Sequence, residues 1–201
     1  MAAHLHTYSG YYETVRLDFA ERHGIDALSS RLDDDLDYLV DFAQGDMESL
    51  IGSADPDSIH HFFSENVSFR AELLRTASRI MLRKKRGRMI FVSSAAASRS
   101  NPGQGFYAAS KLASEALYRS IGIELGSRGI TTVTLRPGYI DAGRGKKYLS
   151  VRGEPALKAV PLMRALTSRE VAEAILFFLS DHAVAFNATE IHMDGGLTAG
   201  K

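Results

Sequence analysis

Short apolar segments alternate with longer segments of helical periodicity along this chain, and this alternation constrains the fold more than any other feature. Met89-Ile90-Phe91-Val92 is a fully apolar run of the kind that is buried in a parallel sheet. Strand signals occur at 14–17, 37–40, 89–92, 131–135 and 190–193, and helix signals at 25–32, 56–86, 105–125 and 168–179. This order predicts an α/β fold in which helices cover both faces of a mainly parallel sheet.

The residues between these segments predict where the chain turns. Asp55 or Asp57 is expected to cap the helix over 56–86, and Gly87 is expected to stop it. A polar segment at 142–159, rich in Gly and Lys, is expected to be a loop.

The composition excludes several classes of protein. Lys plus Arg and Asp plus Glu both number 24, so the net charge is zero and no global field favours nucleic acid or an anionic membrane. The absence of cysteine excludes disulfides and thiol catalysis, and it fits a reducing compartment. No apolar run is as long as the roughly 20 residues that a membrane-spanning helix needs, and no signal peptide is evident. A single domain over 1–201 in the cytoplasm is expected.

Two smaller patterns are expected to be structurally ordinary. The histidine pairs 4/6 and 60/61 lack acidic partners at ligand spacing, so no metal site is predicted. The basic run Arg83-Lys84-Lys85-Arg86 is expected to complement a helix C-terminus on a solvated face.

One group of residues carries chemistry. Tyr107 and Lys111 lie four apart on the predicted helix 105–125, hence on one face. The Lys111 ammonium is expected to lower the pKa of Tyr107 from about 10, which makes this phenol an acid or base toward a carbonyl or alcohol oxygen. Ser94 follows the apolar strand, at the carboxyl end where α/β sheets bind ligands. Asn66 stands in the middle of a predicted helix, where Asn is a poor helix former and needs a reason.

With their neighbours, these positions resemble the short-chain dehydrogenase/reductase superfamily, particularly its 3-oxoacyl-carrier-protein reductase-like members. The resemblance runs from about Thr14 to Gly196 and rests on Gly87-Arg-Met-Ile-Phe-Val-Ser-Ser, Phe106-Tyr-Ala-Ala-Ser-Lys, Leu135-Arg-Pro-Gly and Ile191-His-Met-Asp-Gly-Gly. It implies a Rossmann-like three-layer αβα sandwich and a catalytic tetrad of Asn66, Ser94, Tyr107 and Lys111. In the family, Tyr is the acid/base, Ser holds the substrate oxygen, Lys lowers the Tyr pKa and Asn orders a proton-relay water.

The resemblance also implies a substrate site and partners. The segment 142–160 corresponds to the family's mobile substrate lid. The expected partners are a small-molecule or acyl-carrier-bound substrate, and either further copies in a dimer or tetramer or a full-length relative. Substrate is expected to contact Ala95, Pro137, Gly138, Tyr139 and Tyr148.

The sequence departs from the family where the cofactor binds. The family holds NAD(P) at a glycine-rich turn, whose glycines let backbone N–H groups approach the pyrophosphate. Only thirteen residues precede the strand at 14–17, whereas a βαβ unit needs about 30. A truncated sheet is therefore predicted, without the first strands and their glycine-rich turn, and with the strand at 14–17 paired directly to 37–41. Residues 1–13 form an atypical segment that covers an edge or mediates assembly.

Two later cofactor positions differ as well. The family's Asn-Asn-Ala-Gly appears as Asp41-Phe-Ala-Gln, and its threonine near the nicotinamide aligns with Ala142. No residue is therefore assigned to cofactor binding.

Three functions stay open on this evidence. One is a cofactor-independent enzyme that uses Tyr107, Lys111 and Ser94 for dehydration, isomerisation, cyclisation or retro-aldol chemistry on a β-keto or β-hydroxyacyl-like substrate. Another is an NAD(P)H-dependent ketoreductase as in the family. The third is a non-catalytic subunit that pairs with a full-length relative. The intact acid/base residues beside a missing nucleotide cradle favour the first.

Overall fold

A computed structural model describes residues 12, 14–19, 25, 28, 32, 35–99 and 101–199. In this part of the chain the strands are β1 (Tyr38–Asp41), β2 (Gly87–Val92), β3 (Ile130–Pro137) and β4 (Thr189–Met193). The α-helices are α2 (Pro56–Phe63), α3 (Phe69–Lys84), α4 (Gly105–Leu125), α5 (Gly143–Arg152), α6 (Glu154–Lys158) and α7 (Ser168–Leu179).

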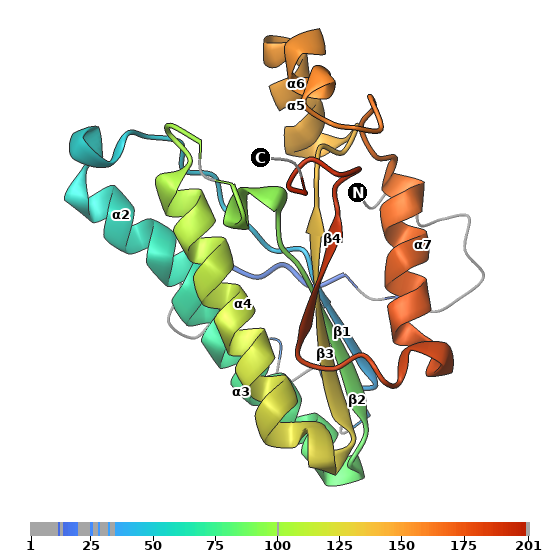
Figure 1. The fold of residues 1–201 in the computed structure, drawn as a ribbon. Coiled ribbons are helices and arrows are strands. Elements are labelled where there is room, and N and C mark those ends of the chain that lie inside the picture. Colours follow the sequence, from blue (N-terminus) through green and yellow to red (C-terminus); the bar gives the residue numbers. More distant parts are fainter. Residues whose placement is uncertain are drawn as a thin grey trace.

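The four strands form a sheet in the order β1-β2-β3-β4, and each pairing is parallel. Figure 1 shows α3 and α4 on one face of this sheet and α7 on the other, with α5 and α6 above the carboxyl ends of the strands. The predicted α/β architecture is confirmed, and so are the strands near 37–40, 89–92, 131–135 and 190–193. Helices α4 and α7 have the predicted bounds.

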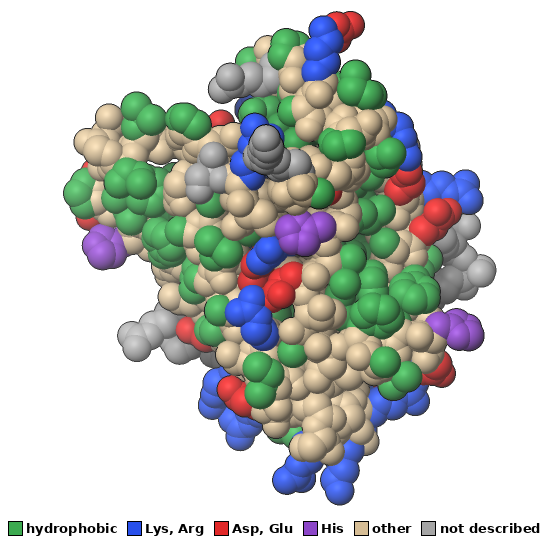
Figure 2. Space-filling model, viewed as in Figure 1, with side chains coloured by type: hydrophobic (Ala, Val, Ile, Leu, Met, Phe, Trp, Pro, Cys, Tyr) green, Lys and Arg blue, Asp and Glu red, His purple; other side chains and the backbone are tan. Residues whose placement is uncertain are grey.

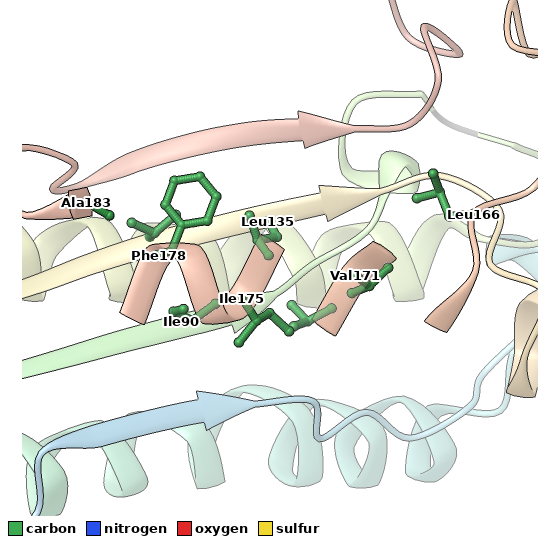
Figure 3. Packing of buried hydrophobic residues seen from close by; sticks show 9 residues of the cluster. Ile90, Leu135, Leu166, Val171, Ile175, Phe178 and Ala183 are labelled. Atoms are coloured by element: carbon green, nitrogen blue, oxygen red, sulfur yellow. The ribbon is translucent and has the colours of Figure 1, made fainter. Parts of the chain in front are cut away.

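Side chains alternate between two cores on the two faces of the sheet. Along β2, Ile90 and Val92 join Val133 and Leu135 in a cluster with residues of α7. Figure 3 shows Ile90 and Leu135 beside Ile175 of that helix. Met89 and Phe91 point to the opposite face, where they pack with buried residues of α3 and α4. The apolar run Met89-Ile90-Phe91-Val92 is explained by this burial on both faces.

The prediction of a strand at 14–17 is wrong, and so is its pairing with β1: these residues form no strand. Leu17 and Phe19 instead pack beside the buried Phe69 and Leu73 of α3. The ring centroids of Phe19 and Phe69 lie 4.2 Å apart. Leu17 and Phe19 therefore pack, partly buried, against a helix and not in the sheet.

The structure describes only part of the helix predicted at 25–32, and it divides the helix predicted at 56–86. Ile25 and Leu28 are helical, and the Leu32 N–H donates to the Leu28 carbonyl at 2.9 Å. The rest of that helix lies outside the described residues, as do 1–11 and 13 of the N-terminal segment. The predicted helix over 56–86 is two helices, because a π-helical turn at Ser64–Ser68 separates α2 from α3.

The two ends of this helical pair are stabilised by different residues. Asp55 is the N-cap of α2, and its carboxylate accepts from the Ser58 N–H at 2.8 Å. The prediction that Gly87 stops the second helix is wrong. Lys85 takes the left-handed conformation at the end of α3, with φ 53°, and Gly87 already belongs to β2. An added Cβ at Gly87 would lie 2.2 Å from Met81 Sδ, so close packing is the reason for this glycine.

The segment 142–160, which we call the lid segment, is not the loop that its composition predicts. It holds α5 and α6, separated by Gly153 at φ 59°. Its base is closed by backbone hydrogen bonds of 2.8 Å from Asp141 N–H to the Leu166 carbonyl and from Leu166 N–H to the Tyr139 carbonyl. Because α5 is rich in glycine and polar residues, its sequence shows no clear helical periodicity.

Basic side chains gather at one end of the molecule. Figure 2 shows Lys and Arg side chains at the end of the molecule where α3 ends and β2 begins. The basic run lies there, and Lys84 pairs with Asp35 and Asp37. Among the described residues no helix is long and apolar enough to cross a membrane.

Candidate active site

Ser94 leaves the sheet at the carboxyl end of β2. It takes an extended conformation and begins a 3-10 turn over Ala95–Ala97, where its hydroxyl accepts from the Ala96 N–H at 3.1 Å. The half-buried side chain is thus held in place by its own turn. This position, beyond the end of a buried parallel strand, is where α/β sheets bind ligands.

Tyr107 stands in the first turn of α4, and its phenol forms a hydrogen bond with Ser94. Burial raises the pKa of Tyr107 above its ordinary value, and the bond from Ser94 and the charge of Arg144 only partly oppose this. The prediction of a lowered tyrosine pKa is therefore wrong. The phenol is protonated at neutral pH, which makes it a proton donor.

Lys111 lies one turn further along α4 and is 2% exposed. Its ammonium donates to the Val92 carbonyl at 2.8 Å and lies 5.8 Å from the Tyr107 ring centroid. Burial lowers the pKa of Lys111 to about 7, and the nearby charge of Arg70 acts in the same direction. The structure thus brings Lys111 beside Tyr107, as predicted from their spacing.

Asn66 is buried inside the π-helical turn. Its side-chain oxygen accepts from the Gly45 N–H at 2.6 Å, and its amide donates to the Phe62 carbonyl at 2.8 Å. An added Cβ at Gly45 would lie 2.9 Å from the Asn66 amide nitrogen, so the loop after β1 needs a glycine here. Asn66 therefore ties this loop to the helices, which is a physical reason for an Asn in mid-helix.

Arg70 and Asp41 form a buried ion pair beneath the site. The two side chains are 3% and 1% exposed, with Arg70 Nε 2.6 Å from Asp41 Oδ2. Arg70 also donates to the backbone carbonyl of Asn66, and the Tyr118 hydroxyl donates to Asp41 at 3.0 Å. The backbone carbonyl of Asn66 is thus occupied by a guanidinium donor in this chain.

The residues expected to contact substrate fall into two groups. Ala95 and Tyr139 meet Val160 in an apolar cluster, and the Tyr139 and Tyr148 rings stack with centroids 5.4 Å apart. Pro137 ends β3 and Gly138 packs on the backbone that follows β4. The first group joins the lid segment to the site, whereas the second shapes the end of the sheet. Contact with substrate stays a prediction for all five.

Arg144 reaches the site from α5. Its guanidinium carbon lies 4.4 Å from the Tyr107 ring centroid. It pairs with Asp46 at 2.9 Å and with Glu48 at 3.1 Å, both in the segment after β1. These contacts connect the lid segment to the loop that Asn66 holds.

Comparisons with known proteins place this arrangement in a family. The family described as Enoyl-(Acyl carrier protein) reductase matches residues 5–198. The chain belongs to the short-chain dehydrogenase/reductase superfamily. It is 33% identical over 184 residues to Nodulation protein G of Rhizobium meliloti, covering 90% of this chain and 75% of that protein. It is 29% identical over 185 residues to 3-oxoacyl-[acyl-carrier-protein] reductase FabG of Salmonella typhimurium, covering 92% of this chain and 70% of that one.

Solved structures of the superfamily share the fold. A short chain dehydrogenase/reductase family protein superposes with a TM-score of 0.84 at 25% identity, covering 92% of this chain and 77% of its own. YwfH, an NADPH dependent reductase involved in bacilysin biosynthesis, gives 0.85 at 18% identity, covering 92% and 76%. This last likeness concerns the fold alone.

The sequence patterns described above did not indicate the roles of Arg70 and Arg144. Arg70 stands four residues after the buried Asn66 and four before the buried Leu74, on the inner face of the helix, and Asp41 ends an apolar strand. Charged residues are rarely buried unless they are paired, so an Asp and an Arg at two buried positions are a signal from which this ion pair could have been predicted. No such signal marks Arg144, because the helix that carries it was expected to be a loop.

In the part of the chain that the structure describes, no three His, Asp or Glu side chains gather closely enough to hold a metal ion. His4 and His6 lie outside that part.

Proposed function

We propose that this protein is an acid/base enzyme that acts on the carbonyl or hydroxyl oxygen of a β-keto or β-hydroxyacyl-like substrate without binding a nicotinamide cofactor by itself. The observation that carries the proposal is the convergence of Ser94, Tyr107 and Lys111 at the carboxyl end of β2. The reactions open to such a site are dehydration, isomerisation, cyclisation and retro-aldol cleavage.

The proton step follows from the charge states of the site. The raised pKa keeps the Tyr107 phenol protonated, and Ser94 offers a second hydroxyl to the same substrate oxygen. As the Tyr107 O–H bond breaks and a new O–H bond forms on the substrate, the phenolate is stabilised by Lys111 and Arg144. A proton from solvent restores the phenol.

The described residues do not fit the phosphates of a dinucleotide. The segment after β1 holds Asp46 and Glu48, whose carboxylates would repel a pyrophosphate, and Phe42, whose side chain stands 60% exposed. The free edge of β1, where such folds form the crevice for a dinucleotide, is bordered by no strand among the described residues. No hydride step is therefore assigned to this chain.

An NAD(P)H-dependent ketoreductase is the second candidate. The names of the relatives favour it, since FabG of Salmonella typhimurium is a 3-oxoacyl-[acyl-carrier-protein] reductase. Tyr107 would donate the same proton in that reaction. A ketoreductase of this kind must bind the nicotinamide cofactor, which makes cofactor binding the discriminating measurement.

We would titrate the protein with NADPH and NADH and follow nicotinamide fluorescence and thermal unfolding together. The proposal expects no saturable binding and no change in the melting temperature. A bound cofactor at 100 times its Kd stabilises a fold by about 2.7 kcal/mol, which a melting curve resolves. Saturable binding would overturn the cofactor-independent function and favour the ketoreductase.

Tyr107→Phe tests the acid/base assignment separately. Loss of a general acid costs roughly 100- to 10,000-fold in rate, so we expect Tyr107→Phe to lower kcat by that order for a β-hydroxyacyl or β-ketoacyl substrate. Tyr38→Phe is the matched control, because Tyr38 opens β1 at the opposite end of the sheet and is 45% exposed. Full activity of Tyr107→Phe would contradict the site, and inactivity of the parent protein would favour a partner subunit.

A further inference from the structure

The guanidinium of Arg144 occupies the space next to the proposed proton donor. Its central carbon lies 4.4 Å from the Tyr107 ring centroid, whereas the Lys111 ammonium lies 5.8 Å from it. Lys111 is buried and donates to a backbone carbonyl, but the Arg144 side chain is 36% exposed. Arg144 is thus the cation near Tyr107 that an entering molecule can reach.

The present partners of Arg144 are replaceable. Asp46 and Glu48 are 59% and 54% exposed, and ion pairs of such groups contribute little free energy in water. Nη1 of Arg144 lies 2.9 Å from Asp46 Oδ1, yet this buried nitrogen makes no hydrogen bond of normal geometry among the described residues. The guanidinium therefore has unused hydrogen-bond donor capacity.

We propose that Arg144 binds the carboxylate of an oxo acid whose carbonyl oxygen faces Tyr107 and Ser94, and that this carboxylate displaces Asp46 and Glu48. This inference rests on the proposed function and names its substrate class. A guanidinium offers paired N–H donors whose spacing matches a carboxylate. A single molecule with its carboxylate close to its carbonyl would engage Arg144 and Tyr107 together.

The same geometry argues against a carrier-bound acyl group as the preferred ligand. A thioester has no charge beside its carbonyl, so it would leave the Arg144 donors with Asp46 and Glu48. The free acid would use these donors in place of Asp46 and Glu48. Because Arg144 comes from the lid segment, binding of the carboxylate would fix α5 over the site.

Calorimetric titration with two probes, acetoacetate and its methyl ester, tests this assignment without requiring turnover. The probes differ in the carboxylate, so their Kd ratio measures recognition of that group. We expect the parent protein to bind acetoacetate at least about tenfold more tightly, as one charge-assisted bond allows. Arg144→Gln should remove the preference, and Arg144→Lys should retain a part of it. Arg169→Gln is the control, because Arg169 pairs with Glu173 on the exposed side of α7.

Removal of the competing carboxylates should act in the opposite direction. Asp46→Asn combined with Glu48→Gln frees Arg144, so acetoacetate should bind several-fold more tightly and the ester should bind as before. Tyr107→Phe should keep the preference for the acid even where it abolishes turnover, which separates this inference from the proposed function. Equal affinities for the two probes, no saturable binding of acetoacetate, or an unchanged ratio in Arg144→Gln would overturn the role of Arg144.

Discussion

Lys111 is 2% exposed, and burial lowers the pKa of its ammonium to about 7. In the unfolded chain the same group keeps its proton up to about its ordinary pKa of 10.5. Between these two values the unfolded state binds more protons, so the contribution of Lys111 to stability rises with pH by up to roughly 1.4 kcal/mol per pH unit. Below about pH 7 the folded protein holds Lys111 in its charged form, and burial of this charge lowers the free energy of unfolding.

Lys111→Met removes this titration, and we expect it to remove the rise in stability between about pH 7 and pH 10. The measurement is the free energy of unfolding in urea at several pH values for both proteins. The difference between the two curves isolates Lys111, since the other titrating groups are common to both. Curves that run parallel across this range would mean that the folded ammonium titrates like a solvated one.

Single residues differ in how far the sequence predicts them. The spacing of Tyr107 and Lys111 fixes that they share a face of α4, and the resemblance adds Ser94 and Asn66. Their charge states could not be predicted, because burial by segments distant in sequence decides the pKa of the phenol and of the ammonium. Arg144 illustrates the same limit, since its contact with Tyr107 depends on a helix that its polar composition conceals.

Between elements, the pair of Asp41 and Arg70 joins β1 to α3 beneath the site. Arg70→Met would leave the Asp41 carboxylate buried with only the Tyr118 hydroxyl and a backbone N–H, and loss of one partner of such a pair costs about 3–5 kcal/mol. Asp41→Asn should also be destabilising, because it leaves the Arg70 guanidinium buried without its carboxylate partner. The double variant removes both charges, so we expect it to lose clearly less than the sum of the single losses.

A double-mutant cycle measured by urea unfolding checks this coupling. An interaction free energy of roughly 0.5–3 kcal/mol is typical of residues in one buried network. Strictly additive losses would show that the charges are solvated in the folded state and that their proximity carries no energy.

Elements with a strong apolar pattern were predicted well, and two of the failures share one cause. Strand β2 and helices α4 and α7 are defined by their own sequence pattern. The segment 14–17 has the local pattern of a strand, but its Leu17 and the nearby Phe19 pack as partly buried side chains against α3. The π-helical turn likewise carries a distant hydrogen bond, which the Gly45 N–H donates to the Asn66 side chain. Tertiary contacts override local pattern in both cases.

For the whole molecule, the sheet separates two hydrophobic cores that share its strands. One core includes Ile175 of α7, and the other includes Leu74 of α3. The two residues are 6% and 2% exposed. Because β2 contributes alternate side chains to both cores, loss of either core should release the sheet and thereby the other core. The chain is therefore expected to unfold in one cooperative transition.

Ile175→Ala and Leu74→Ala test this cooperativity from the two faces. Each substitution should lower the free energy of unfolding by about 2–5 kcal/mol, as truncation of a buried aliphatic side chain does. The two losses should add within about 0.5 kcal/mol, because the sheet lies between the sites. Leu176→Ala is the matched control, since Leu176 adjoins Ile175 but is 65% exposed. Far-UV and near-UV circular dichroism should report one shared midpoint in every variant. Two separate midpoints in Ile175→Ala would mean that α7 and its face of the sheet unfold independently of the layer that carries Tyr107 and Lys111.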